Sequence, residues 1–190
     1  MTAITGLMAF LLLSGAALGA VPAYANAPVA PEVSSYTVTL TAYNAVPGQT
    51  DSQPLITASG AYSNPEVVAA RSQDLGDELP FGTIIAIIGP SSEDNSCGYN
   101  VVAPIIGYRV IADTMNIRYS DRVDILFPTK ANYLTSNGST INASTILGIC
   151  ADSSVRVVGH IDITNPNNLP KTQEALAALV NGITAPLAAK

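Results

Sequence analysis

The sequence predicts an all-β protein, a small closed β-barrel followed by one short helix. Short apolar runs rich in β-branched and aromatic residues are separated by frequent turn signals, which is typical of barrels and sandwiches. Helical spacing of apolar residues occurs only near the C-terminus. The 190 residues suit one domain with accessory segments, and neither an internal repeat nor a phosphate-binding glycine loop is present.

The expected elements follow from these runs in chain order. Residues 36–43 alternate β-branched, aromatic and small side chains, which indicates a strand. Residues 67–70, 84–88, 122–127 and 155–163 are the other single strands, and 99–112 is read as a strand pair interrupted by Pro104 and Gly107. The Asn- and Ser-rich piece 132–144 is a loop or the loose start of a helix. The C-terminal helix is indicated by apolar residues at helical spacing, namely Leu176, Leu179, Val180 and Ile183.

The first 27 residues are predicted to be an export signal peptide. They contain no charged side chain, residues 4–20 are apolar, and small-x-small cleavage sites end at Ala27 or Ala25. Because no Lys or Arg precedes the run and the run is nearly long enough to span a bilayer, a retained membrane anchor stays open as an alternative. Residues 28–34 are a linker, 35–164 the barrel domain and 165–190 a tail with the short helix.

Charge and residue counts exclude several function classes. The net charge is −6 and all charged residues follow the signal segment, so nucleic acid is not an expected partner. Bulk electrostatics cannot hold an anionic cell-wall polymer either, so glycan binding must be local. His160 is the sole histidine and no Cys-x-x-Cys spacing exists, so neither a metal site nor a cofactor is predicted.

The two cysteines, Cys97 and Cys150, are predicted to form a disulfide. An even cysteine count in an exported chain favours a bridge, and we expect their Cα atoms within about 7 Å of each other. Two buried free thiols are the alternative.

Two acids frame the stretch 113–127, which is the chemically most informative part of the chain. Asp113 ends one apolar run and Asp124 lies within another, where alternation places it on the face opposite Val123 and Ile125. Burying an unpaired carboxylate is expensive, so its charge must be held or used. The sequence leaves two explanations open, a functional carboxylate or a structural ion pair with Arg118 or Arg122.

Seven motifs in this order resemble those of a known family. They are T-A-Y (41–43), Q-T-D (49–51), T-A-S-G (57–60), V-V-A-A (67–70), L-P-F-G-T (79–83), D-T-M-N-x-R-Y (113–119) and R-V-D-I-L-F (122–127). Together they resemble the Asp-Asp-Asp ("3D") domain, and the resemblance covers residues 35–164. It implies a six-stranded double-psi β-barrel, the fold that also forms the catalytic part of membrane-bound lytic transglycosylase A.

The resemblance also implies an activity on peptidoglycan glycan strands. The family cleaves between N-acetylmuramic acid and N-acetylglucosamine, and its general acid/base falls on Asp124, with Asp113 in support. We expect these two acids on neighbouring strands facing one groove. Polar side chains available to bind the sugars are Thr57, Ser59 and Asn116, and rings available to stack on them are Tyr43 and Tyr119.

One departure from the family pattern concerns its third acid. That Asp usually follows the V-V-A segment, where this chain has Arg71, and Asp74 or Asp77 are the candidates to replace it. A catalytically silent glycan-binding module on the same barrel is therefore the alternative to an exported lytic transglycosylase.

Overall fold

A computed structural model describes residues 33–91 and 97–184 of the chain. The predicted export signal, residues 28–32 of the linker and the last six residues of the tail lie outside the described residues. None of the helices within the described ranges has the length and apolar character needed to span a membrane.

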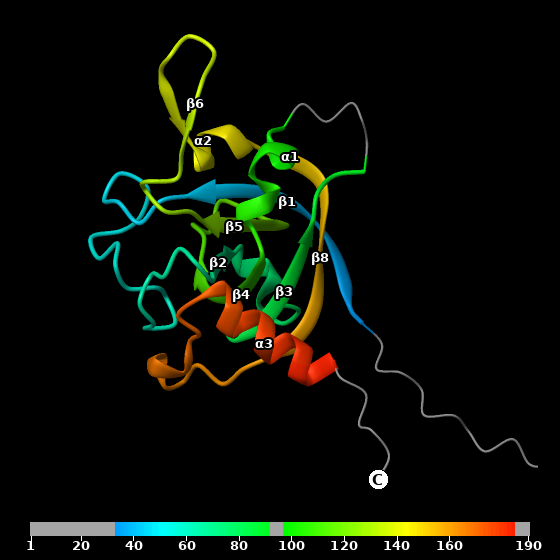
Figure 1. Cartoon of the computed structure of the whole chain (residues 1–190). Coiled ribbons are helices and arrows are strands. Elements are labelled where there is room, and N and C mark those ends of the chain that lie inside the picture. Colours follow the sequence, from blue (N-terminus) through cyan, green and yellow to red (C-terminus); the bar gives the residue numbers. More distant parts are fainter. Residues whose placement is uncertain (1–32, 92–96, 185–190) are drawn as a thin grey trace, which may run out of the picture. The chain divides into compact units, whose positions relative to one another are not determined.

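Six strands form a closed barrel in the order β1-β5-β2-β4-β3-β8 (Figure 1). Their bounds are β1 Ser35–Tyr43, β2 Val68–Arg71, β3 Thr83–Ile88, β4 Tyr108–Thr114, β5 Arg122–Leu126 and β8 Cys150–His160. Two pairs are parallel, β1 with β5 and β2 with β4, and the other four are antiparallel. The predicted closed barrel of six strands is confirmed.

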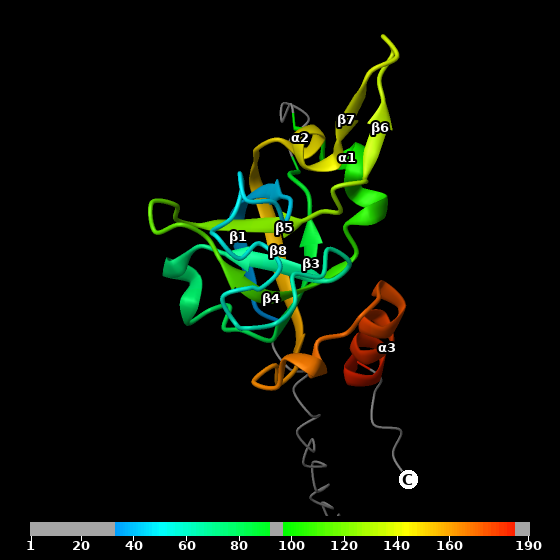
Figure 2. The same ribbon diagram turned by 90° about the vertical axis from the view of Figure 1, so that its left-hand side faces the viewer.

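The remaining elements surround the barrel. The strands β6 (Asn132–Leu134) and β7 (Thr140–Asn142) form a hairpin that projects beyond the barrel, with α2 (Ala143–Leu147) at its base (Figures 1 and 2). Helix α1 is Tyr99–Val102 and the C-terminal helix α3 is Gln173–Thr184. Single 3-10 turns occupy Gln73–Gly76, Ala103–Ile105 and Pro166–Asn168. Helix α3 confirms the predicted short helix.

Two groups of buried apolar side chains hold the fold together. The first has members on all six barrel strands, so it fills the barrel interior; these include Leu40, Ala69, Ile85, Ile111, Ile125 and Val155. The second joins other residues of β2 and β4 to α3 through side chains such as Val68, Val110, Leu176 and Val180. Burying each large aliphatic side chain contributes about 1.5–3 kcal/mol relative to leaving it exposed.

The predicted alternation along β5 agrees with this division. Val123 and Ile125 belong to the barrel interior, whereas Leu126 belongs to the second group. Asp124, which lies between Val123 and Ile125 in sequence, is half-buried. Its side chain therefore lies outside the barrel interior, as the period of two requires.

The predicted strand pair over 99–112 is wrong in its first half, because residues 99–105 are helical. Val102 and Ile106 are buried while Val101 and Ile105 are exposed, a spacing of four that belongs to a helix. Pro104 also lacks the N–H that a central strand needs. The i, i+4 signal was present in the sequence, but the β-branched composition concealed it.

Residues 132–144 and the last strand also differ from expectation. The Asn- and Ser-rich piece forms the β6–β7 hairpin and only then enters α2, where the Asn142 side chain caps the helix by accepting a bond from the Ser144 amide at 3.0 Å. Strand β8 begins at Cys150, five residues earlier than expected, because Ser153 and Ser154 pair with β1.

The Cys97–Cys150 disulfide is present, with the two Cα atoms 5.3 Å apart. It joins Cys97, two residues before α1, to the first residue of β8. Because α2 ends three residues before Cys150, the bridge also ties this helix to α1. The predicted pairing is confirmed.

Besides its apolar contacts, helix α3 is joined to the barrel by hydrogen bonds of its first residue, Gln173. The Gln173 amide accepts a hydrogen bond from the Tyr108 amide at 3.1 Å and donates to the Tyr108 carbonyl at 2.8 Å, as a neighbouring strand would. Gly107 makes this approach possible, since it has a φ of +58° and a Cβ there would lie 2.1 Å from the Gln173 Oε1.

Candidate active site

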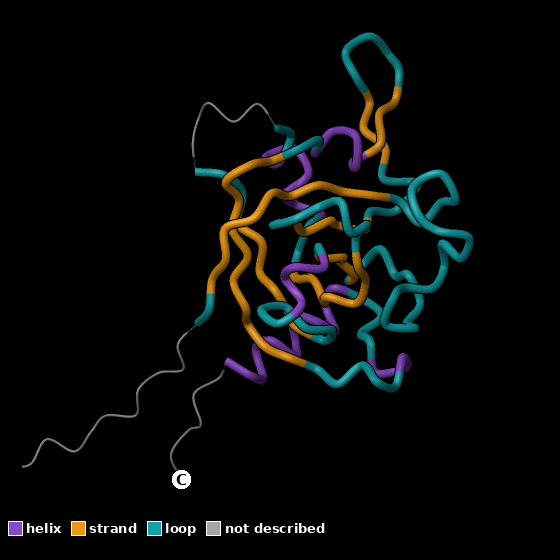
Figure 3. The backbone as a smooth tube through the Cα atoms, turned by 180° about the vertical axis from the view of Figure 1, so that it is seen from behind, coloured by secondary structure: helices purple, strands orange, loops and turns teal. Residues whose placement is uncertain are grey.

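A cleft of about 950 Å³ opens on the barrel where the ends of β1 and β4 meet the loop 44–58 and helix α2. In Figure 3 most of the loops, including this one, gather on one side of the strands. Among the described residues, the acids that line the cleft are Asp51, Asp113 and Asp124. The two acids that the sequence singled out therefore share one cavity.

A single row of paired residues crosses the cleft wall. Thr41 on β1 pairs with Asp124 on β5, Asp124 pairs with Ala70 on β2, and Ala70 pairs with Asp113 on β4. The expectation that the two acids lie on neighbouring strands is wrong, since β2 runs between β5 and β4. Only the methyl group of Ala70 separates them in the row, so the carboxylates still face the same cleft.

An irregularity in the β2–β4 pair brings Asp113 into this row. Ala69 pairs with Ile111, but the next residue, Ala70, pairs with Asp113, so Ala112 is an extra residue in β4. Strict alternation from Ile111, a barrel-interior residue, would direct Asp113 inward as well. Bulges of this kind change the direction of a side chain and are frequent beside active sites.

The environment of Asp124 disfavours its ionised form. Burial raises the pKa of Asp124 to about 6; the hydrogen bond from the Thr41 hydroxyl opposes the rise, nearby Asp113 adds to it, and Arg122 opposes it. The Thr41 Oγ1 donates to the Asp124 Oδ1 at 2.8 Å. A carboxyl with a pKa of about 6 is protonated in about a tenth of molecules at pH 7 and in more at lower pH, so it can both give and accept a proton.

Asp113, in contrast, is held by three donors. Its Oδ1 accepts hydrogen bonds from the backbone amides of Ala58 and Thr114, both at 2.9 Å, and its Oδ2 accepts one from the Tyr43 hydroxyl at 2.9 Å. Burial and the adjacent Asp113 raise the pKa of Tyr43 well above its ordinary value, so Tyr43 stays a donor. In the described part of the chain, hydroxyl and amide groups rather than arginine side chains bind both carboxylates.

The polar residues expected to bind sugars lie in or beside the cleft. Thr57 and Asn116 line it. Ser59 does not line it but shares a 3.0 Å hydrogen bond with the Thr57 hydroxyl. Thr57 is itself buried and donates to the Ala61 carbonyl at 3.1 Å. Asn116 is exposed and is the freest of the three to meet a ligand.

The two candidate stacking rings differ from each other. Tyr43 lines the cleft but is only 7% exposed, and it contributes its hydroxyl to Asp113 rather than an open ring face. Tyr119 lies under two cations, since the Arg118 and Arg122 guanidinium carbons are 4.8 and 4.9 Å from its ring centroid. A sugar that stacks on Tyr119 has to share the ring with these arginines.

The residue that departs from the family pattern, Arg71, serves the fold. Its guanidinium donates to the backbone carbonyls of Leu79 and Ser72 at 2.8 and 3.1 Å and lies 5.4 Å from the centroid of the Phe81 ring. Neither Arg71 nor either of the acids proposed to replace the family's third Asp lines the cleft.

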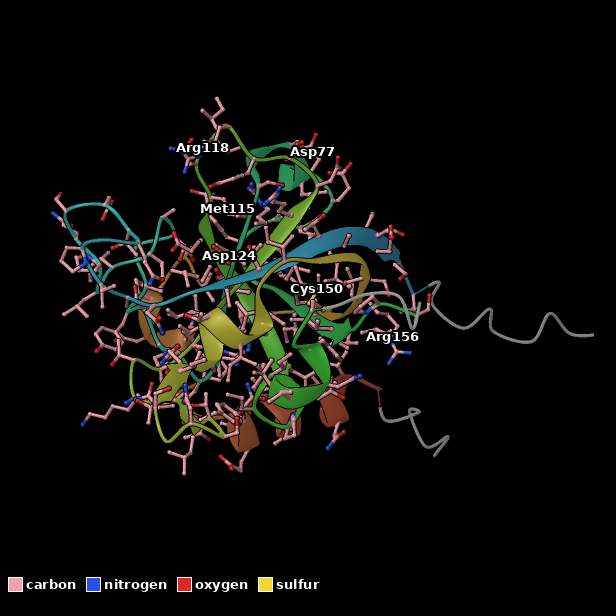
Figure 4. All side chains as sticks on the ribbon, turned by 90° about the horizontal axis from the view of Figure 1, so that it is seen from above. Asp77, Met115, Arg118, Asp124, Cys150 and Arg156 are labelled. Atoms are coloured by element: carbon pink, nitrogen blue, oxygen red, sulfur yellow. A yellow bond between two sulfur atoms is a disulfide. The ribbon has the colours of Figure 1, made fainter. Side chains whose placement is uncertain are left out.

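Asp74 also has a structural partner. Its Oδ2 accepts a hydrogen bond from the Asp121 amide at 2.8 Å, and the Ser72 hydroxyl with this amide lowers the pKa of Asp74. Asp77 is exposed and lies away from Asp124 in Figure 4.

Sequence reasoning missed several contributors to the site. Thr41 lies within the T-A-Y motif, but only its pairing with Asp124 shows that its hydroxyl reaches the carboxyl. Helix α2 contributes Ser144 and Thr145 to the cleft and is tied to the end of β1 by a 2.9 Å hydrogen bond from Ser144 to Asn44. No local pattern links these segments, which lie 100 residues apart.

The described residues contain no group of three or more His, Cys, Asp or Glu side chains arranged to hold a metal ion. The site is thus a polar cleft with one fixed carboxylate and one proton-exchanging carboxyl. No protein-family model matches the chain, and a search of curated proteins found no match.

Proposed function

We propose that this chain is an exported member of the Asp-Asp-Asp domain family, a double-psi β-barrel that cleaves peptidoglycan glycan strands as a lytic transglycosylase. The observation that carries the proposal is the Asp124 carboxyl, whose pKa is raised to about 6 on the wall of a cleft of about 950 Å³. Seven collinear motifs support the family, and six of them (41–43, 49–51, 57–60, 67–70, 113–119 and 122–127) contribute residues to this cleft.

Two further features support the fold type and the compartment. The parallel pairs β1–β5 and β2–β4 within a closed six-stranded barrel are consistent with a double-psi barrel. The Cys97–Cys150 disulfide supports an oxidising compartment, as export requires.

The proposed reaction needs one carboxyl. Protonated Asp124 gives its proton to the glycosidic oxygen as the bond from C1 of N-acetylmuramic acid to that oxygen breaks. The muramic O6 hydroxyl then attacks C1, and the Asp124 carboxylate accepts the O6 proton, which restores the starting state and leaves a 1,6-anhydro ring. Ordinary glycosidases need a second carboxylate to act as the nucleophile or to activate water; here the substrate supplies the nucleophile.

The other cleft residues have supporting roles in this proposal. Asp113, fixed by its three donors, adds to the raised pKa of Asp124 and keeps the proton available. Asn116 is exposed in the cleft and available to hydrogen-bond sugar substituents, whereas the buried Thr57 hydroxyl is already bonded within the protein. No cofactor is required by the chemistry.

A silent glycan-binding module is the second candidate function. The observation that favours it is Arg71, which stands where the family has an acid and whose guanidinium donates hydrogen bonds to backbone carbonyls. Both candidate functions use the same cleft to bind the same glycan. Only the formation of cleavage products distinguishes the enzyme from the binding module.

Mass spectrometry of peptidoglycan sacculi incubated with the purified protein tests the proposal. We expect 1,6-anhydro-muropeptides from the wild type, none from Asp124→Asn, and unchanged products from Asp77→Asn, a matched change of an exposed acid outside the cleft. General acid–base catalysis contributes about 10²–10⁴-fold, so the loss is measurable. Binding without products by the wild type supports the silent module. Reducing ends in place of anhydro ends would make the protein a hydrolase, with Asp51 as the remaining cleft acid to activate water.

A further inference from the structure

Two arginines of the cleft have no role in the proposed reaction. Arg118 belongs to the segment that connects β4 to β5 and Arg122 is the first residue of β5, and both line the cleft that holds Asp113 and Asp124. The chain has only eight Lys and Arg residues against fourteen acids, so two adjacent cations in one cavity are a local exception to its acidic character.

The contacts of these arginines leave most of their donors available. Both guanidinium groups lie over the ring of Tyr119, and the Arg118 Nη2 also donates to the Tyr119 hydroxyl at 2.9 Å. A guanidinium carries five N–H donors, so this arrangement orients the two groups without saturating them. In the described part of the chain, an aromatic ring and not a carboxylate fixes both side chains.

Two other arginines of this chain show what a structural role looks like. The Arg109 side chain is 1% exposed and its guanidinium donates to four backbone carbonyls, and Arg71, at the end of β2, likewise donates to carbonyls of the segment that follows it. Arg118 is exposed and Arg122 half-buried, and no such set of backbone acceptors surrounds them among the described residues. Their remaining donors are therefore available to a group that enters the cleft.

We infer that Arg118 and Arg122 form a carboxylate-binding subsite, which selects glycans whose sugars carry an acidic substituent near the bond that faces Asp124. Paired guanidinium groups match the two oxygens of a carboxylate, and a charge-assisted hydrogen bond is about twice as strong as a neutral one. The choice of ligand rests on the proposed function: in peptidoglycan the carboxylate comes either from the lactyl ether of muramic acid or from a peptide stem attached to it.

The test is calorimetric binding to the full chain carrying Asp124→Asn, which prevents turnover. The ligands are a tetrasaccharide of alternating N-acetylglucosamine and N-acetylmuramic acid with free lactyl carboxylates, the same compound with lactyl methylamides, and the same compound with stem peptides. We expect at least one of the two acidic ligands to bind about tenfold or more tighter than the methylamide, and the ligand that does so identifies the source of the carboxylate.

Substitutions then assign the effect to the subsite. Arg118→Gln should remove the preference for the acidic ligand and Arg118→Lys should restore part of it, whereas Arg156→Gln, an exposed arginine on the other side of the view in Figure 4, should leave it unchanged. Arg118 is the residue of choice because Arg122 also lowers the pKa of Asp124. The preference should weaken as salt is added.

Three results overturn the subsite: equal affinity for the acidic and methylamide ligands, an Arg118→Gln variant that keeps the preference, or no measurable binding of either acidic ligand at millimolar concentration. These outcomes are separable from those of the catalytic proposal. If the wild type yields no anhydro products but still prefers the acidic ligand through Arg118, the subsite proposal stands and the catalytic proposal fails. If the wild type yields anhydro products equally from the acidic and methylamide ligands, the catalytic proposal stands and the subsite proposal fails.

Discussion

Replacement of Asp124 by Asn should make the protein more stable at alkaline pH while removing the proposed activity. The folded chain raises the pKa of this carboxyl from 3.8 to about 6, mainly by burial. Between these two pH values the folded state binds the proton more tightly than the unfolded state does. The free energy of unfolding therefore falls as pH rises through this window, and the loss is complete above about pH 6.

The size of the effect follows from the same shift. A rise from 3.8 to about 6 corresponds to roughly 3 kcal/mol once the group is ionised in both states. Since Asp124 is only half-buried, solvent screens part of this, and we expect about 1–2 kcal/mol. Asn has the same shape and still accepts the Thr41 hydroxyl, but it carries no charge to desolvate.

Urea unfolding of the wild type and of Asp124→Asn at pH 4, 6 and 8 measures this difference. Circular dichroism is the suitable signal because the chain contains no Trp. The variant should match the wild type at pH 4 and exceed it by about 1–2 kcal/mol at pH 8. Asp77→Asn, the exposed control, should show no such pH dependence. A variant that is less stable at pH 8, or a difference that stays constant with pH, refutes the assignment of a raised pKa to Asp124.

Three other changes test neighbouring parts of the structure. Thr41→Val removes the hydrogen bond that lowers the pKa of Asp124, so the fall of kcat/KM with rising pH should begin at a higher pH, and an unchanged profile contradicts this role. Ala70→Leu inserts a larger side chain between the two carboxylates; it should reduce product formation at least about tenfold while circular dichroism shows the barrel retained at about 1–3 kcal/mol lower stability. Cys97→Ser combined with Cys150→Ser opens a loop with a sequence separation of 53 and should lower the free energy of unfolding by about 4 kcal/mol in urea, whereas a loss below about 1 kcal/mol would show that the bridge does not restrict the unfolded chain.

The parts of the fold that sequence reasoning predicted are those governed by local pattern. Alternation in 122–127 predicted that Val123 and Ile125 share a face of β5 opposite Asp124, and apolar spacing after residue 170 predicted α3. Even there, Leu179 and Ile183 of the predicted apolar face are 41% and 50% exposed, since only Leu176 and Val180 reach the second group of buried residues. Periodicity predicts that a helix is present, but not how many of its apolar side chains are buried against the rest of the protein.

The parts that sequence reasoning missed depend on contacts between distant segments. The extra residue Ala112, which brings Asp113 beside Ala70, exists only relative to the register of β2. The buried Arg109 has an ordinary strand neighbourhood in sequence, and its carbonyl partners come from a loop, a 3-10 turn and the end of β5. The placement of both acids in one cleft was predicted, but the strand that separates them was not, because chain order does not give strand order.

The strand that completes the barrel has a consequence for how the protein is made. Strand β8 pairs with both β1 and β3, so each of these keeps one side without a partner until residues 150–160 have been synthesised. At about 5–20 residues per second, β1 waits on the order of ten seconds on the ribosome.

During this interval the nascent chain presents open strand edges, which invite pairing with other chains. Because β8 is the last barrel strand in the sequence, the barrel cannot close before residues 150–160 have been made. Under the proposed export, a translocation channel that accepts only extended polypeptide receives the chain before β8 closes the barrel, and a holding chaperone binds the open edges of β1 and β3.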